Sequence, residues 1–273
     1  EAIFVRFNYG ANQQETDLGR ITELTNDEVF FDRVTTVENS AFMPNAIFEN
    51  FFIPARGKQD AVRDHALTLA NEWVSPMFEA PTGWAALDLL MRRTPRLLDS
   101  SHLEPVRSED YLAAISGTTT RLNSSVLAVQ GPPGSGKTYV GSHTIARLVA
   151  SGKRVGVVAN SHSAVENLLS GCINAGIDPM AIAKQKKTGD SSARAWQTPS
   201  TYAVMANWRS KQAGGYVIGG TAWTFCSPKV LEQKLDYLFI DEAAQFSLVD
   251  AIAVAQSATN MVLLGDPQQL TQV

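Results

Sequence analysis

From residue 126 onward, short runs of apolar residues alternate with stretches in which apolar residues return every three or four positions. The runs predict strands buried on both faces, and they lie at 126–129, 154–159, 180–183, 216–219, 237–240 and 261–264. Helical spacing is clear at 139–150 and 163–175, whereas residues 184–213 are the least regular. Strands that alternate with helices predict an α/β fold, a mostly parallel sheet with helices on both faces.

The first 53 residues show a different pattern. β-rich runs at 3–7, 19–24 and 28–31 alternate with turn residues, and the pair Asn26-Asp27 predicts a hairpin turn. We expect residues 1–53 to form a small β-rich, barrel-like subdomain. Nothing in its sequence suggests catalysis, so the expected role is packing or spacing.

Residues 54–115 change to helical character and are expected to form a helical stalk or linker before a third region, 116–273. Helical spacing of apolar residues predicts helices at 59–74, 84–98 and 108–115. Pro95 should end or kink the second of these helices. The same helix carries a cluster of three arginines, Arg92, Arg93 and Arg96. This basic cluster either contacts phosphate or forms a solvated helix face.

The loop between the run at 126–129 and the helix at 139–150 reads Gly131-Pro132-Pro133-Gly134-Ser135-Gly136-Lys137-Thr138. A glycine-rich loop between a strand and a helix is the arrangement of a P-loop, whose backbone N–H groups cradle phosphate oxygens. We therefore predict that residues 131–139, ending with Tyr139, bind ATP. Lys137 would reach the β- and γ-phosphates, and Thr138 would ligate Mg²⁺. A glycine turn without a ligand is the alternative.

Two acids follow the apolar run at 237–240. The segment Leu238-Phe239-Ile240-Asp241-Glu242 has the form of a Walker B element. In that interpretation Asp241 holds Mg²⁺ through its water shell, and Glu242 deprotonates the water that attacks the γ-phosphate. An exposed turn is the alternative, but ligands of such sheets bind at the carboxyl ends of the strands.

Composition narrows the class of protein. Of 273 residues, 44% are apolar and 18% are charged, which excludes disorder of the whole chain. The formal charge of −4 argues against a protein that coats nucleic acid by bulk electrostatics. No apolar run could span a bilayer and no secretory signal is present, so we expect no membrane partner. Cys172 and Cys226 suggest neither a disulfide framework nor a zinc site, which fits the cytoplasm.

Asp241-Glu242-Ala243-Ala244-Gln245 is followed, after a helix and a strand, by Gly265-Asp266-Pro267-Gln268-Gln269-Leu270. A D-E-A-x-Q motif followed by a G-D-x-x-Q-L motif resembles the superfamily 1 helicases, in the branch of the nonsense-mediated-decay helicase and the nuclease-helicases of replication. The chain is also similar to the helicase part of bacterial RecB-like nuclease-helicase fusions. The resemblance implies that Gln269 senses the γ-phosphate and that Gln245 ties the Walker B loop to this sensor.

Two further segments are similar to the motifs with which this family contacts a single strand. In 158–168, Ser161 and His162 fall on the polar pair that meets the nucleic-acid backbone, and in 217–223, Thr221 falls on a phosphate contact. Trp223 either stacks on a base or belongs to the core.

The resemblance implies a P-loop NTPase fold and the first RecA-like motor domain of an ATP-dependent helicase or translocase. Its partner would be single-stranded nucleic acid, with DNA favoured over RNA. The family pattern also implies a second RecA-like domain with arginine fingers and a fused nuclease domain. The chain lacks a starting Met and stops just after 265–270. We therefore expect an excised piece that binds nucleotide, hydrolyses it poorly and unwinds nothing.

The sequence departs from the family in one place. The glutamine that reads adenine has no counterpart in 109–115, and Gln130 lies too close to the loop to replace it.

A rival function is a nucleotide-gated binding or regulatory module without motor activity. Glu242 favours hydrolysis, since a pure switch could dispense with a base. A GTPase is disfavoured because the sequence has no Asn-Lys-x-Asp guanine reader.

Overall fold

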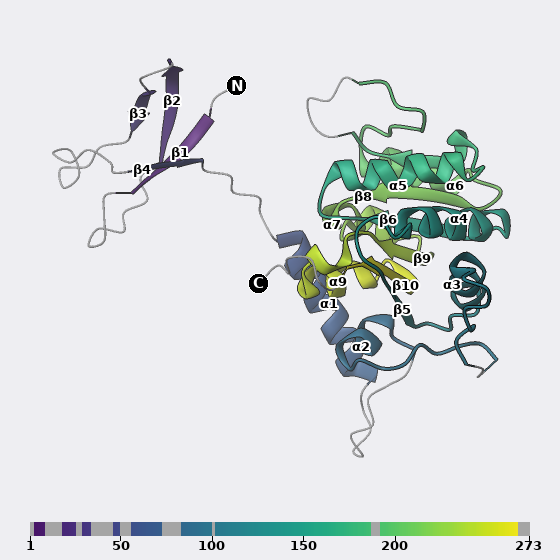
Figure 1. Ribbon diagram of the computed structural model, residues 1–273. Helices are drawn as coiled ribbons and strands as arrows, with labels where there is room; N and C mark the ends of the chain where they lie inside the picture. Colours follow the sequence, from purple (N-terminus) through teal and green to yellow (C-terminus); the bar gives the residue numbers. More distant parts are fainter. Residues whose placement is uncertain are drawn as a thin grey trace. The chain divides into compact units, whose positions relative to one another are not determined.

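The computed structural model describes residues 3–8, 18–25, 29–33, 46–49, 56–72, 83–99, 102–186 and 192–266. The chain forms two compact units, Glu1–Pro54 and Ala55–Val273 (Figure 1). Among the described residues, no helix combines the length and the apolar character that crossing a membrane needs.

The first unit contains a four-stranded antiparallel sheet. Its strands, in the spatial order β3-β2-β1-β4, are β1 (Ile3–Asn8), β2 (Leu18–Leu24), β3 (Val29–Arg33) and β4 (Ala46–Glu49). β2 pairs with β3 as a hairpin requires, with a register shift between Ile21 and Glu23. The predicted turn at Asn26-Asp27 lies outside the described residues.

Three helices precede the parallel sheet: α1 (Arg56–Glu72), α2 (Ala85–Leu90) and α3 (Tyr111–Thr120). α3 begins at residue 111 rather than 108, because Ser108 and Glu109 have positive φ angles of 49° and 61°. The Asp110 carboxylate caps the helix by accepting a hydrogen bond from Ala113 N at 2.9 Å. α3 then continues past residue 116.

The predicted helix at 84–98 is wrong beyond Leu90. Arg92 has a φ of 51°, which an α-helix does not allow. Arg93 and Arg96 turn back to the fully buried Asp88 and form ion pairs of 3.3 and 2.9 Å. Ser125 Oγ, next to the first strand of the large sheet, donates to Asp88 at 2.8 Å. Arg93 and Arg96 therefore lie on no solvated helix face, because they neutralise a buried carboxylate.

The second unit is built on a six-stranded sheet in which all neighbouring strands are parallel. In the spatial order β5-β10-β9-β6-β8-β7, its strands are β5 (Val126–Gln130), β10 (Ala258–Gly265), β9 (Leu235–Ile240), β6 (Arg154–Val158), β8 (Tyr216–Gly220) and β7 (Ile182–Lys184). Each predicted apolar run overlaps one strand, although the run at 180–183 begins in the 3₁₀ turn Pro179–Ala181 and shares only its last two residues with β7. The predicted α/β fold with a parallel sheet is confirmed.

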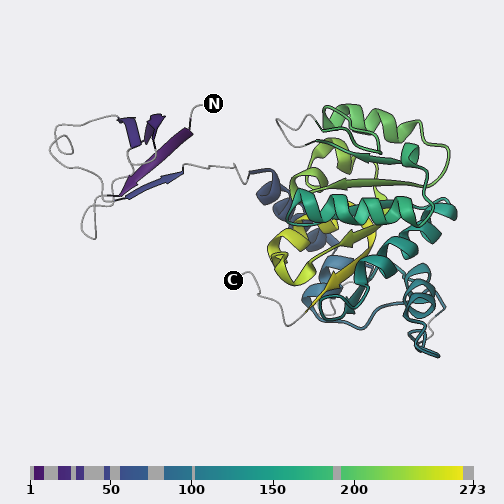
Figure 2. The ribbon, with the colours of Figure 1, turned by 45° about the horizontal axis from the view of Figure 1, so that its top comes forward.

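Helices cover both faces of this sheet (Figures 1 and 2). One core packs α4 (Lys137–Ala150) and α5 (His162–Asn174) against side chains such as Tyr237 and Phe239. On the opposite face, Leu238 and Ile240 contact a second core, which also includes residues of α1, α2 and α9 (Leu248–Ala255). This alternation explains why the strands are apolar throughout, and each fully buried side chain stabilises the fold by roughly 1.5–3 kcal/mol.

The second core also contains three helices that the sequence pattern did not predict: α6 (Tyr202–Ser210), α7 (Ala222–Phe225) and α8 (Pro228–Leu231). α6 lies within 184–213, where no regular pattern was visible. Its buried positions are Met205 and Arg209, four residues apart. Because an arginine occupies an inward position, the apolar period of this helix is broken.

Candidate functional site

The residues predicted to carry chemistry follow the carboxyl ends of five neighbouring strands. The P-loop follows β5, the segment with Ser161 follows β6, Thr221 follows β8, Asp241 follows β9, and Asp266 follows β10. Because all these strands are parallel, their carboxyl ends share one edge of the sheet. The fold thus brings segments more than 100 residues apart in sequence to the same edge.

The P-loop turns through two glycines with positive φ, Gly134 at 75° and Gly136 at 82°. Gly136 directly precedes α4, whose first-turn N–H groups have no partner within the helix and point to the loop side. A Cβ at Gly131 would lie 2.5 Å from Ser135 Oγ, so a larger residue there would displace the Ser135 side chain. Pro132, Pro133 and Thr138 are exposed. The loop has the backbone shape and exposure of an anion cradle.

Lys137 lies inside this loop. Its ammonium donates to the carbonyl oxygens of Gly131 and Pro132, the latter at 2.8 Å. Tyr139, in the first turn of α4, is exposed and packs its ring against His143, with ring centroids 4.0 Å apart. The lysine charge is therefore held at the loop, where phosphate oxygens would lie.

Asp241 and Glu242 end β9 close to this charge. Asp241 is 8% exposed, and its backbone N–H donates to Val158 O at 2.9 Å, which ties the end of β9 to the end of β6. Burial raises the pKa of the Asp241 carboxyl above its usual value, and the charge of Glu242 also raises it. The backbone N–H of Glu242 and the charge of Lys137 lower the same pKa. Lys137 and Asp241 thus share one electrostatic environment.

Glu242 has a left-handed backbone, with φ at 52°. This region is strained for a residue with a side chain, and such strain is concentrated at functional sites. The Glu242 N–H donates to Asp241 Oδ1 at 3.0 Å, which fixes the two acids relative to each other. The geometry is that of a sharp turn that presents a half-buried carboxylate at the edge of the sheet.

The chemistry of Thr138 and Asp241 fits Mg²⁺. Among the residues that the structure describes, no group of three or more His, Cys, Asp or Glu side chains is placed to hold a metal ion by itself. Mg²⁺ at phosphate sites keeps several waters and takes one or two protein oxygens together with phosphate oxygens. One exposed hydroxyl on α4 and one carboxylate on β9 match this small donor set.

The motif segments also contact each other directly. Gly131 N donates to Gly265 O at 3.2 Å, which joins the P-loop to the end of β10. A Cβ at Gly265 would lie 3.1 Å from Ala244 N, so the turn after Glu242 packs closely on β10. Gln245 ends a short 3₁₀ turn, Ala243–Gln245, at this place. Gln269 lies outside the described residues.

Sequence reasoning missed Asn160. Its side-chain amide donates to the backbone oxygen of Gln245, so the segment after β6 is bonded to the Walker B turn. The residue directly precedes the quoted polar pair, and only the fold reveals its contact. The sequence also gave no sign of a cavity of about 290 Å³ beside the P-loop. This cavity is lined by Tyr111 and Ile115 of α3 together with Gln130 and Lys137.

The predicted single-strand contacts lie at the same edge. Ser161 caps α5 by accepting a hydrogen bond from Ala164 N at 3.1 Å, and half-buried His162 is the first residue of that helix. Thr221 precedes α7 without a side-chain cap bond. Trp223 is half-buried, and the Lys58 ammonium lies over its ring at 4.7 Å from the centroid. One partner of the Trp223 ring is thus a lysine of α1.

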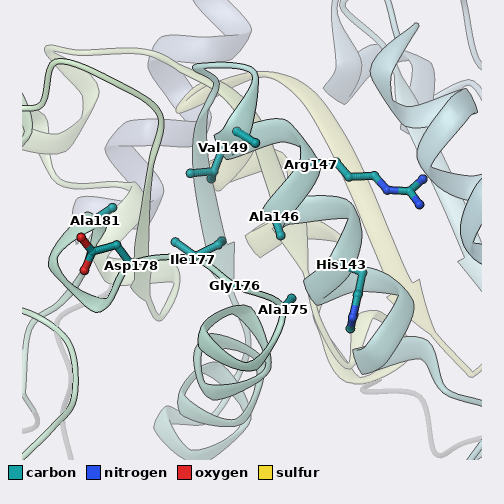
Figure 3. Close-up of a pocket in the computed structure, with 10 residues that line it drawn as sticks. His143, Ala146, Arg147, Val149, Ala175, Gly176, Ile177, Asp178 and Ala181 are labelled. Carbon is teal, nitrogen blue, oxygen red and sulfur yellow. The ribbon is translucent and has the colours of Figure 1, made fainter.

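A larger cavity of about 450 Å³ is separate from these residues. Figure 3 shows it between α4 and the loop after α5, where His143, Ile177 and Asp178 line it. Arg147 of α4 extends away from Ile177 in this view. None of the motif residues predicted from the sequence belongs to its described lining.

Comparisons with known proteins bear on most of the second unit. The model of the AAA domain family matches residues 113–273. The DNA replication ATP-dependent helicase/nuclease DNA2 of Saccharomyces cerevisiae is 28% identical over 144 residues, which are 52% of this chain and 10% of that protein. The Arabidopsis thaliana protein JHS1, which bears the same description, is 27% identical over 142 residues, 52% of this chain and 11% of that protein. These relatives confirm the resemblance to the nuclease-helicases of replication.

The chain spans about a tenth of the length of the curated relatives that it matches. Among solved structures, an arterivirus nonstructural protein 10 (helicase) with DNA is similar at 21% identity, with a TM-score of 0.34, over 54% of this chain and 30% of that one. The UvsW helicase of bacteriophage T4 is similar at 12% identity, with a TM-score of 0.36, over 75% of this chain and 70% of that one.

Proposed function

The chain belongs to the AAA domain family, and from this premise we propose that it is the first motor domain of an ATP-dependent helicase or translocase acting on single-stranded nucleic acid. The observation that carries the proposal is the placement of the Lys137 ammonium in the P-loop after β5 and of buried Asp241 after β9, at the same edge of one parallel sheet. The names of DNA2 and JHS1 include ATP dependence, which supports ATP as the nucleotide.

In this proposal the chain holds the triphosphate mainly through its backbone. The first-turn N–H groups of α4 and the loop that contains Gly134 and Gly136 surround the phosphate oxygens. Lys137 exchanges its carbonyl partners for the β- and γ-phosphates. Thr138 and Asp241 would hold Mg²⁺, which when bound neutralises charge on the phosphate oxygens.

Glu242 is the proposed general base. Its carboxylate accepts the proton of the attacking water, and the fixed turn after Asp241 keeps it at the reacting edge. Gln245 and Gln269 would report the state of the γ-phosphate to the rest of the domain. The bond from Asn160 to the Gln245 carbonyl supports such a link, because Asn160 directly precedes Ser161.

Ser161, His162, Thr221 and Trp223 are the proposed contacts to the single strand. The names of the relatives describe DNA replication, which supports DNA rather than RNA. Two further parts are proposed for the full-length protein, a second RecA-like domain that supplies arginine fingers and a fused nuclease domain. Arginine fingers can contribute about 10³ to 10⁵ in rate, so this chain alone should hydrolyse ATP slowly. Its two buried free cysteines, Cys172 and Cys226, support a cytoplasmic location.

A strand-stimulated ATPase assay on the full-length protein tests the proposal. Single-stranded DNA should increase the rate of hydrolysis, and Glu242→Gln should lower kcat by about 10² to 10⁴ while ATP binding is kept. The matched control is Glu232→Gln, because Glu232 is exposed on the surface and pairs with Lys229. A wild-type protein that binds ATP and DNA but hydrolyses nothing would instead indicate a nucleotide-gated binding module.

A further inference from the structure

A polar cavity of about 440 Å³ lies at the amino ends of β9 and β10, the edge of the sheet opposite to the P-loop. α1 contributes His65, the start of α2 contributes Trp84, and the segment before β9 contributes Lys234. Its volume falls in the usual range of small-molecule sites, about 300–1,000 Å³. The P-loop, Asp241 and the proposed strand contacts do not belong to its described lining.

His65 is the unusual residue of this cavity. Its side chain is only 7% exposed, yet neither Nδ1 nor Nε2 has a hydrogen-bond partner in the part of the chain that the structure describes. The ring packs against Trp84, with ring centroids 4.9 Å apart. Buried polar atoms are almost always hydrogen-bonded, so the contents of a polar cavity are expected to satisfy this imidazole.

The charge around His65 indicates what those contents are. Burial, and then the Lys234 ammonium, lower the pKa of His65 below its usual value. Lys234 is exposed, and no described lining residue carries a negative charge. From the other elements the cavity is lined by Trp84 directly before α2, Gln256 after α9 and Thr259 of β10, and none of these side chains titrates. The neutral His65 imidazole can donate a hydrogen bond, and the Lys234 ammonium lies beside it. An oxyanion can bind both groups.

We propose that this cavity binds a small molecule bearing a phosphate or carboxylate group. The oxyanion pairs with the Lys234 ammonium and accepts a hydrogen bond from the His65 ring, which gives the buried imidazole its partner. Lys234 lowers the pKa of His65, and a bound anion raises it. Binding of the anion therefore favours protonation of the imidazole. The site therefore binds its ligand more tightly as the pH falls. It does not rest on the proposed motor function.

The test is an NMR titration of the His65 ring in the 273-residue chain with inorganic phosphate and, separately, acetate. Lys137→Ala serves as the background, so that the P-loop does not take up phosphate. We expect one or both probes to raise the pKa of His65, and binding at about pH 6 to be tighter than at about pH 7.5. Response to only one probe identifies the group that the site accepts.

Two lysine variants separate this site from general charge effects. Lys234→Ala should weaken binding by about tenfold, because a charge-assisted hydrogen bond is lost. Lys229→Ala is the control, since Lys229 is also exposed but pairs with Glu232 outside the cavity lining. The proposal is overturned if neither anion changes the His65 pKa, which would indicate a water-filled cavity. Equal binding by wild type and Lys234→Ala would overturn it as well.

Discussion

Asp241 illustrates at the residue level how a proposed metal-binding role opposes stability. Burial raises its pKa above the ordinary value of 3.8. The folded chain therefore holds the Asp241 proton more tightly than the unfolded chain does. Between the two pKa values, this group makes the free energy of unfolding fall as the pH rises. At neutral pH the folded protein carries the full cost of a buried carboxylate, which a bound cation would offset.

Asp241→Asn should accordingly stabilise the chain in the absence of nucleotide while it weakens Mg²⁺-dependent ATP binding. We expect the free energy of unfolding at about pH 7 to rise by about 0.5–2 kcal/mol, the usual range for a stabilising substitution. Urea denaturation at about pH 7 and about pH 4 measures this, and the gain should shrink at the lower pH.

The control for this experiment is Asp110→Asn. Asp110 is exposed and caps α3, and asparagine caps helices equally well, so its stability should not change. If Asp241→Asn were less stable than wild type at neutral pH, the account of Asp241 as an uncompensated buried charge would be wrong.

At the scale of elements, Arg209 joins three segments of the second core. Its side chain is 2% exposed and donates to Tyr216 Oη of β8 at 3.0 Å and to Val230 O of α8 at 2.7 Å. It also donates to Gln233 O. Arg209 itself lies in the last turn of α6, so one side chain holds α6, α8 and β8 together.

Arg209→Met should lower the free energy of unfolding by roughly 2–4 kcal/mol, because buried carbonyl oxygens lose their donors. Arg147→Met is the matched control. Arg147 is exposed on α4, and its side chain makes no hydrogen bond or ion pair in the described part of the chain, so its replacement should change stability by less than about 0.5 kcal/mol. Equal effects of the two substitutions in urea denaturation would contradict this role for Arg209.

The same elements show which helices and strands the sequence pattern could predict and which it could not. Strands such as β6 and β9 were predictable because burial on both faces makes every position apolar. α6 was not, because Arg209 occupies an inward position. The end of α2 was predicted wrongly because Arg93 and Arg96 read as helix-surface residues, whereas their partner Asp88 is buried.

The candidate site also combines features that the sequence could predict with contacts that it could not. The P-loop and the acids after β9 are local motifs, so the sequence was sufficient to place them after β5 and β9. The bond from Asn160 to Gln245 and the packing of Gly265 on Ala244 join segments that are far apart in the chain. The opposite cavity depends on His65 and Lys234, which are 169 positions apart. No local pattern predicts such contacts.

At the scale of the whole molecule, α1 belongs to the core of the second unit. Ala61 is buried, Lys58 pairs with Asp250 of α9 at 2.8 Å, and Gln256 Nε2 donates to Ala61 O at 3.0 Å. The sequence suggested that residues 54–115 are a stalk or linker before a motor domain at 116–273. α1 and α2 pack in the second core and belong to the same compact unit as the sheet, so we propose that they fold together with it.

Two truncations test this organisation. A chain that begins at residue 55 should keep a cooperative thermal transition and the nucleotide affinity of the full chain. A chain that begins at residue 116 loses α1, α2 and half of α3, which exposes core side chains of β5 and α9. Its Tm should fall by about 10 °C or more, if it folds at all. Equal Tm values for the two truncated chains would show that residues 55–115 are only a linker.

We propose that Lys137 and Asp241 belong to one ATP site at the carboxyl edge of the sheet. The most direct measurement is the affinity of the chain for a fluorescent ATP analogue with Mg²⁺, compared among wild type, Lys137→Ala and the exposed-lysine control Lys153→Ala. We predict that Lys137→Ala binds about tenfold more weakly or worse, since a charge-assisted phosphate contact is lost, while Lys153→Ala matches wild type. Equal affinity of all three folded proteins would contradict the claim.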